Sequence, residues 1–160
     1  MFFLCLIFKP KKLYNFKFLP EVQCLWEVKR LRVLVPLDFS KEAENAYEFA
    51  KKQGWEVIVL HVLEEGLLES IYPFFSIPSL DFKKFVEERK EQVENELEKY
   101  DAVKRIVKVG KCWKEIIKTA EEENVDAIVM TRRGAGLEEV LLGSCAERVV
   151  RHATKPVLVV

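Results

Sequence analysis

From residue 31 onward, short apolar runs rich in β-branched residues alternate with stretches of helical periodicity, and this alternation limits the possible folds more than any other feature. The run LRVLVP and four later ones predict strands at residues 31–36, 56–62, 105–110, 126–131 and 156–160. Such alternation is typical of a parallel sheet covered by helices on both faces. We therefore predict a doubly wound α/β domain of five strands and four helices.

The four helices are predicted from apolar spacing and from residues that begin or end helices. Ser40 is a suitable N-cap for the first helix, and Gly54 a suitable stop. The second helix is long, and its outer face is acidic. The predicted inward positions are, helix by helix, Ala43, Ala46, Tyr47 and Ala50; Phe82, Phe85, Val86, Arg89, Val93, Leu97 and Tyr100; Trp113, Ile116, Ile117 and Ala120; and Cys145, Val149 and Ala153.

Residues 66–80 are rich in proline and aromatic side chains, so they are too irregular for a regular element and too apolar for a solvated loop. A contiguous apolar segment of this kind is expected to pack on another surface. We predict that it covers an edge of the sheet. The alternatives are a lid over a site and a contact between subunits.

The composition favours one domain without a highly charged partner. A chain of 160 residues can bury an adequate core, and its 26 basic residues balance its 26 acidic ones, which gives no indication of nucleic-acid binding. The four cysteines form no C-x-x-C pair and have no nearby His to complete a zinc set, which is typical of a reducing, cytoplasmic location. Cys112 and Cys145 are expected to be small buried thiols on the apolar sides of their helices.

Residues 1–30 differ from the rest and are treated as an extension that precedes the domain at 31–160. The apolar run MFFLCLIF is too short to span a bilayer, and six basic residues against two acidic ones follow it rather than precede it. We therefore expect neither a secretory signal nor stable membrane insertion. An added edge strand, a basic arm that touches membranes, and translation from upstream of the true start are the open alternatives.

The ends of the strands indicate where a ligand would bind, because doubly wound sheets bind ligands beyond the carboxyl ends of their strands. Asp38 follows the first strand and can accept from a base or ribose, help hold a metal, or cap the next helix. A glycine-rich stretch follows the fourth strand, and there Gly143 and Ser144 precede an apolar helical pattern. Backbone amides at such a helix start favour an anion.

The glycine stretch also has interpretations without a ligand. Ser144 with Glu147 three residues later forms a capping-box pattern, which would cap the helix whether or not phosphate binds. Gly134 and Gly136 are suitable turn residues. Elsewhere, His61 stands alone inside an apolar strand and is expected to be a core residue with satisfied hydrogen bonds.

Several separated blocks resemble the universal stress protein family. They are LRVLVPLDFSKEAENAYEFAKK, EVIVLHVLE, VDAIVMTRRGAG and LLGSCAERVVRHATKPVLVV, in the family's order along residues 31–160. The resemblance implies five parallel strands in the order 3-2-1-4-5, so that the winding reverses between the first and fourth strands. It says nothing about the first 30 residues.

Many members of that family bind ATP through the motif G-x-x-G-x9-G-[ST]. Here Gly134, Gly143 and Ser144 match it, whereas Thr131 stands where the first glycine is expected and only eight residues separate Gly134 from Gly143. A threonine adds bulk and restricts the backbone at that point. The resemblance implies ATP, with or without magnesium, bound by Pro36, Leu37, Asp38, Val62, Thr131, Arg132, Arg133, Gly134, Gly136, Gly143 and Ser144. Val62 would contact the adenine through its backbone, and the two arginines would either supply phosphate charge or be solvated.

Two functions follow from these features. The first is an ATP-binding stress-response or signalling protein that acts as a dimeric switch. It would hydrolyse ATP slowly at most, because the sequence has no G-x-x-x-x-G-K-[ST] loop and no evident base. The second is a dimeric interaction module that binds no ATP, which the threonine at position 131 favours. An adenylating or electron-transfer enzyme is disfavoured because an S-G-G-x-D-S loop is missing.

Both functions predict a homodimer and an unidentified protein partner. The strand from Pro156 to Val160 would be a bare apolar edge if it stayed unpaired, and such edges favour pairing with another chain. In the family this strand pairs with its symmetry mate.

Overall fold

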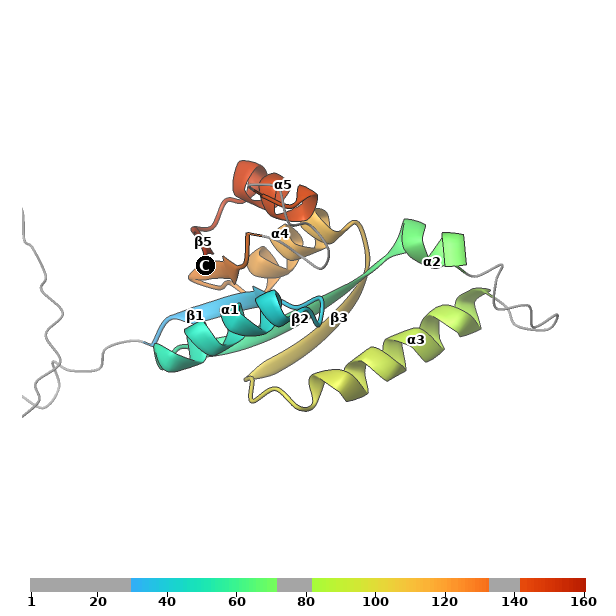
Figure 1. Cartoon of the computed structure of the whole chain (residues 1–160), viewed down its shortest axis with the longest axis horizontal. Helices are drawn as coiled ribbons and strands as arrows, with labels where there is room; N and C mark the ends of the chain where they lie inside the picture. The colour runs from blue at the N-terminus through green and yellow to red at the C-terminus, as the bar shows by residue number, and fades with distance from the viewer. Residues whose placement is uncertain (1–29, 72–81, 133–141) are drawn as a thin grey trace, which may run out of the picture.

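The computed structural model describes residues 30–71, 82–132 and 142–160. Its strands are β1 (Arg32–Pro36), β2 (Glu56–Glu64), β3 (Lys104–Gly110), β4 (Ala127–Met130) and β5 (Val157–Val159). They form one parallel sheet in the order β3-β2-β1-β4-β5 (Figure 1). The predicted fold class, strand order and number of strands are therefore confirmed.

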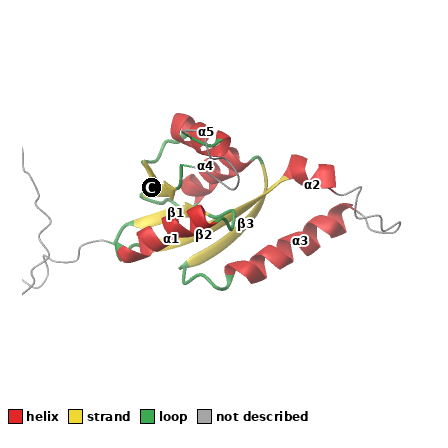
Figure 2. Cartoon of the chain, in the orientation of Figure 1, coloured by secondary structure: helices red, strands yellow, loops and turns green. Residues whose placement is uncertain are grey.

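Helices cover both faces of the sheet (Figure 2). They are α1 (Lys41–Lys52), α2 (Glu65–Ile71), α3 (Phe82–Leu97), α4 (Cys112–Glu122) and α5 (Ser144–His152). The core on one face joins Val33 and Val35 to α1, α2 and α3, and the core on the other face joins Leu34 to α4 and α5. Because successive residues of β1 point into opposite cores, this strand is apolar at every inner position.

The first helix begins and ends as predicted. Ser40 is its N-cap, and the Oγ atom accepts a hydrogen bond from the backbone N–H of Ala43 at 3.2 Å. Gly54, with φ +74°, turns the chain behind the helix, and its N–H donates to the carbonyl of Lys51 at 2.9 Å. Glycine suits this position because its missing Cβ permits positive φ.

Two features of the middle of the chain differ from the predictions. The stretch from residue 66 is not irregular at its start, because α2 runs to Ile71 and is anchored by Leu68, which is 3% exposed. Residues 72–81 lie outside the described residues. Arg89 is exposed rather than inward, because a permanently charged guanidinium is unfavourable in an apolar core.

The long helix α3 ends at Leu97, and the side chain of Arg105 donates to carbonyls at this end and in the turn that follows. Arg105 donates from Nε to the carbonyl oxygen of Leu97 at 3.1 Å and from Nη2 to that of Tyr100 at 2.6 Å. A cation at a helix C-terminus is favourable because the last carbonyls carry a partial negative charge. Tyr100 follows in a turn and stays buried as predicted.

The chain winds outward from β1 in both directions. From β1 it builds β2 and then β3 on one side, and it crosses back to build β4 and β5 on the other side. The carboxyl ends of β1 and β4 therefore diverge into helices on opposite faces, which leaves a crevice at this switch point. Within the described ranges, no helix combines the length and apolar character needed to cross a bilayer.

Candidate functional site

A cavity of about 360 Å³ lies at the carboxyl ends of β1 and β4. Its volume lies in the range of about 300 to 1,000 Å³ that is usual for small-molecule sites. Seven of the predicted site residues line it: Pro36, Leu37, Asp38, Val62, Thr131, Gly143 and Ser144. The fold thus brings together residues that are up to 108 positions apart in the chain, from Pro36 to Ser144.

The other four predicted residues are placed differently. Arg132 is exposed and is not among the residues that line the cavity, although its carbonyl accepts from the N–H of Gly143 at 2.8 Å. Arg133, Gly134 and Gly136 lie outside the described residues. The sequence predictions for these three positions stay predictions.

Seven further residues, none of them predicted as site residues from the sequence, also line the cavity. They are Ala43, Leu60, Cys112, Ile116, Met130, Cys145 and Ala146. Most of them are core residues by their spacing, and the apolar face of α4 continues from the core into the cavity wall. Helical spacing identifies such a face, but only the packing of α4 beside α5 shows where the face stops being covered.

The start of α5 differs from the capping-box interpretation. Gly143 is the N-cap, Ser144 is the first helical residue, and no side chain caps the helix. Glu147 pairs instead with Arg151, at 2.7 Å between carboxylate and guanidinium. The capping box is therefore wrong, because Ser144 lies one residue too late to act as the cap. The first turn of α5, from Ser144 to Ala146, contributes to the cavity wall, so an anion could accept from its N–H groups.

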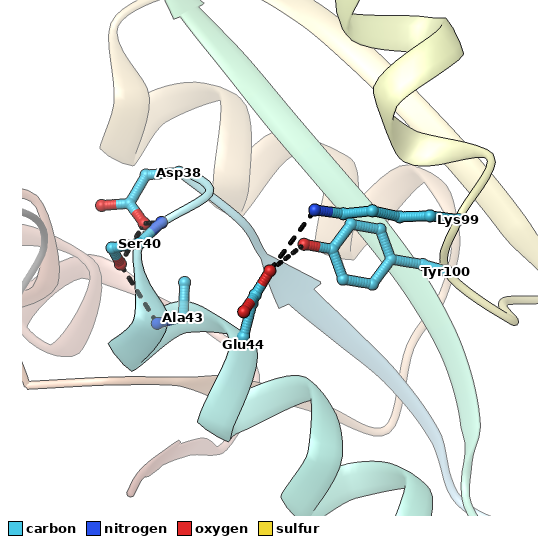
Figure 3. Close-up of polar contacts among 6 residues, drawn as sticks. All are labelled: Asp38, Ser40, Ala43, Glu44, Lys99 and Tyr100. Carbon is cyan, nitrogen blue, oxygen red and sulfur yellow. Dashed lines mark hydrogen bonds and ion pairs between the residues drawn. The ribbon is translucent and has the colours of Figure 1, made fainter.

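The loop after β1 is held by a chain of hydrogen bonds (Figure 3). Asp38 accepts at Oδ1 from the N–H of Ser40 at 3.0 Å and from its hydroxyl at 2.5 Å. Ser40 in turn caps α1. Asp38 is therefore not itself the cap of that helix, and its exposed carboxylate is positioned at the cavity by Ser40. Within the described ranges, no three His, Cys, Asp or Glu side chains gather into a metal site.

His61 supports the same loop from β2. Its Nδ1 lies 2.7 Å from the carbonyl oxygen of Leu37, so this nitrogen carries the proton and donates it. The ring stacks on Phe39, with 4.7 Å between centroids. Burial lowers the pKa of His61, and the hydrogen bond to Leu37 opposes this effect only in part. The sequence predicted a core histidine with satisfied hydrogen bonds; the hydrogen bond is present, although His61 is half-buried, and it stabilises the backbone beside Asp38.

A second group of polar side chains connects α1 to the turn after α3 (Figure 3). Glu44 accepts at Oε1 from the hydroxyl of Tyr100 at 3.2 Å and from the ammonium of Lys99 at 3.4 Å. The ammonium also lies 5.6 Å from the centroid of the Phe39 ring. Burial raises the pKa of the Tyr100 hydroxyl, which keeps it protonated and able to donate. Phe39, whose φ is +62°, is thus packed between His61 and Lys99.

The two helices beside the cavity are joined by a disulfide between Cys112 and Cys145, with 6.1 Å between the Cα atoms. Both residues line the cavity and both are half-buried. The prediction of two separate buried thiols is therefore wrong. A separation of 33 residues contains no local signal for the bridge, and only the packing of α4 against α5 brings the two side chains within reach.

The fold and this site together define a class of protein. An open parallel sheet of order 3-2-1-4-5 with a cavity at the switch point is a doubly wound α/β protein of the kind that takes small ligands at strand ends. A sequence model of the universal stress protein family matches residues 29–160. The chain belongs to the universal stress protein family, as its sequence blocks predicted.

Individual relatives agree with this assignment. Universal stress protein MJ0577 of Methanocaldococcus jannaschii is 39% identical, over 81% of this chain and 93% of the relative. Universal stress protein MJ0531 of the same organism is 30% identical, over 81% of each. The solved structure of hypothetical protein MJ0577 matches with a TM-score of 0.68 and 34% identity, over 83% of this chain and 96% of that one. The crystal structure of hypothetical protein PH0823 matches with a TM-score of 0.63 and 34% identity, over 81% and 94%.

Proposed function

We propose that this chain binds ATP in the cavity at the switch point and acts in the cytoplasm as a dimeric switch in stress response or signalling. The observation that carries the proposal is the start of α5. Gly143 is the N-cap of this helix and has no side chain. No side-chain oxygen therefore accepts from the N–H groups of the first turn as a cap. An anion at that position would satisfy them and would also interact favourably with the helix dipole.

The remaining parts of the cavity suit the rest of the nucleotide. Asp38 offers a carboxylate to ribose hydroxyls, and Val62 and Leu60 offer an apolar wall beside backbone groups for the base. Thr131 replaces the first glycine of the family motif, yet it is one of the residues that line a cavity of about 360 Å³. Space beside this residue supports the proposal in spite of the substitution.

We propose that occupancy, rather than turnover, is the functional event. Among the described residues that line the cavity, Asp38 is the only carboxylate and none is a histidine. Asp38 is already bonded to Ser40, which makes it a poor base for an attacking water. Hydrolysis would then be slow, and bound ATP would persist long enough to alter the loops around the site.

The proposed dimer uses β5, which is an edge strand of the sheet in the part of the chain that the structure describes. Leu158 in this strand and Val160 just after it are 38% and 39% exposed. An apolar edge with open backbone groups favours the addition of another strand. A second copy offers the same edge, so that two copies could pair about a two-fold axis.

One experiment tests the nucleotide proposal directly. The full chain is purified without added nucleotide and denatured, the released small molecules are identified, and ATP with magnesium is then titrated by calorimetry. We expect Ser144→Ala to weaken binding roughly threefold to tenfold by removing a hydrogen-bond donor. Gly143→Val, which places a branched side chain at the helix start, is expected to abolish binding. Ser70→Ala on α2 is the matched control, because its exposed hydroxyl donates to the carbonyl of Leu67 and Ser70 is not among the residues that line the cavity.

The second candidate function is a dimeric interaction module without a nucleotide. Thr131 and the shortened spacing of the glycine motif favour it. The same experiment separates the two functions: a protein that is purified empty and that also fails to bind added ATP with magnesium would favour the interaction module.

A further inference from the structure

The disulfide forms part of the cavity wall, where a small molecule in the cavity can react with it. Both Cys112 and Cys145 line the cavity, and neither is fully buried. A small molecule that reaches the cavity therefore also reaches the bridge. In a cytoplasmic protein, as we propose here, disulfides are usually transient and serve catalysis or redox sensing.

The bridge also restrains the backbone, because it links the start of α4 to the start of α5. Cys112 is the first residue of α4, and its N–H donates to the carboxylate of Glu64 at 2.9 Å. The same helix is anchored in the core by Ile116, which is 1% exposed. Cys145 is the second residue of α5. The bridge thus attaches the first turn of α5 to a firmly held helix.

The order of α5, the helix at the other end of the bridge, depends on such tertiary attachments. This helix has nine residues, and Ala146 and Val149 are its buried ones. Isolated helices shorter than about 12 to 15 residues are marginal in water, so the order of α5 comes from tertiary contacts. A covalent tie at its second residue orders the same turn that contributes to the cavity wall.

We propose that the Cys112–Cys145 bridge is a thiol-exchange site reached through the cavity, and that its reduction loosens the first turn of α5 and weakens anion binding there. The co-reactant is a low-molecular-weight thiol. The anion part of this inference rests on the proposed nucleotide function, whereas the effect on helix order does not.

The exchange is balanced in two steps. A thiolate attacks one Sγ atom, the bond between the two cysteines breaks, and a mixed disulfide and one cysteine thiolate result. A second thiolate attacks the sulfur of the small molecule in the mixed disulfide and releases the second cysteine thiolate. The bridge has then gained two electrons, the two cysteines take protons from water, and two small thiols have become one small disulfide. The small disulfide re-forms the bridge by the reverse route.

Reduction should weaken ATP binding for two reasons: the first turn of α5 becomes less ordered, and the two sulfur atoms need more room. The bridged form holds the first turn of α5 ready, so that an anion need not order it on binding. The reduced form has two unbonded sulfur atoms, which need more room than a bonded pair and take it from the cavity or from the helix contacts. We expect ATP to bind about fivefold to tenfold more weakly to the reduced form. By linkage, a tenfold difference means that saturating ATP lowers the reduction potential of the bridge by about 30 mV.

The experiment uses the full chain with Cys5→Ser and Cys24→Ser, so that only the two bridging residues titrate. It is equilibrated with oxidised or reduced glutathione, and its thiols are counted by intact mass after alkylation. Hydrogen exchange of the amides at residues 144–149 is then measured in both forms without nucleotide, and ATP affinity is measured in both forms by calorimetry. The same background with Cys112→Ser and Cys145→Ser is the control, and it should respond to neither glutathione state.

The outcomes separate the two proposals. Faster exchange at residues 144–149 in the reduced form, with weaker ATP binding, supports the thiol-exchange site and its control of the cavity. If no bridge forms with oxidised glutathione, or if amide exchange is the same in both forms, the inference is overturned. Equal ATP affinities in both forms overturn the control of anion binding. If ATP binds to neither form while amide exchange still differs, the nucleotide function fails and the effect of the bridge on α5 stands.

Discussion

Replacement of Ser40 by alanine would remove two hydrogen bonds from the junction between β1 and α1. The hydroxyl oxygen accepts from the N–H of Ala43 at 3.2 Å, which caps the helix, and the hydroxyl donates to Asp38 at 2.5 Å. Both bonds belong to the loop that places Asp38 at the cavity. The variant therefore tests whether the local structure of the site depends on this one hydroxyl.

The expected loss of stability is the sum of the free energies that the two hydrogen bonds contribute. Loss of a serine N-cap costs about 1 kcal/mol. The bond to Asp38 is worth less than a buried charged bond, because the carboxylate is exposed and water replaces the hydroxyl, and we assign it about 0.5 kcal/mol. The free energy of unfolding should then fall by about 1.5 kcal/mol, which for a chain of this size lowers Tm by about 3 to 6 °C.

Urea unfolding followed by circular dichroism measures this change, with an unchanged dependence on urea as the sign that the native fold is kept. Ser40→Thr retains the hydroxyl and should lose much less stability. Ser70→Ala removes an exposed hydroxyl from α2 and should change stability by less than about 0.5 kcal/mol. A loss below about 0.5 kcal/mol for Ser40→Ala, or an equal loss for Ser40→Thr, would refute the cap and its link to Asp38.

Three further predictions concern other parts of the molecule. Burial lowers the pKa of His61, so the unfolded chain binds the proton more readily; stability is fully present above the unfolded pKa of about 6.5 and falls as pH drops through the lower folded pKa. Urea midpoints from about pH 7 to about pH 5 should therefore fall more for the wild type than for His61→Asn, and parallel curves would contradict this origin. Arg105→Met should lower the free energy of unfolding by about 1 kcal/mol, because it leaves the carbonyls at the end of α3 without their cation; an unchanged urea midpoint would exclude that role. Leu158→Glu should convert the proposed dimer to a monomer in light scattering, while Leu67→Glu on α2, where the leucine is even more exposed at 60% against 38%, should not; a wild-type monomer would also contradict the proposal.

The positions of the strands could be predicted from the sequence because the central strands are buried on both faces. In a chain with this many charged residues, short continuous apolar runs such as residues 31–36 are typical of strands that are buried on both faces. The strand order came from the family resemblance and not from periodicity, since apolar spacing does not state which strands are neighbours. The short helix α2 was missed because its seven residues give too little periodicity, and Leu68 is its one buried position.

About half of the cavity wall could be predicted, and the reason is again geometric. Residues at the carboxyl ends of parallel strands share one edge of the sheet, so Pro36, Asp38 and Thr131 could be grouped from their positions in the sequence alone. The residues that α4 contributes could not, because the same apolar side chains serve as core where a neighbour covers them and as cavity wall where none does. The N-cap of α5 was placed one residue too late, because Gly143 and Ser144 are both acceptable caps by residue type.

The sequence by itself determined the alternation of strands and helices, the membership of the family and the residues at the strand ends, because each depends on local spacing or on blocks that can be recognised in order. Only the tertiary structure decided that Cys112 and Cys145 bond, that Gly143 rather than Ser144 caps α5, and that Asp38 is bonded to Ser40 beside the cavity. These depend on distances between helices and loops whose packing joins residues far apart in the chain. Periodicity along a chain carries no information about such distances, since it describes which face of an element is apolar and not what lies opposite that face.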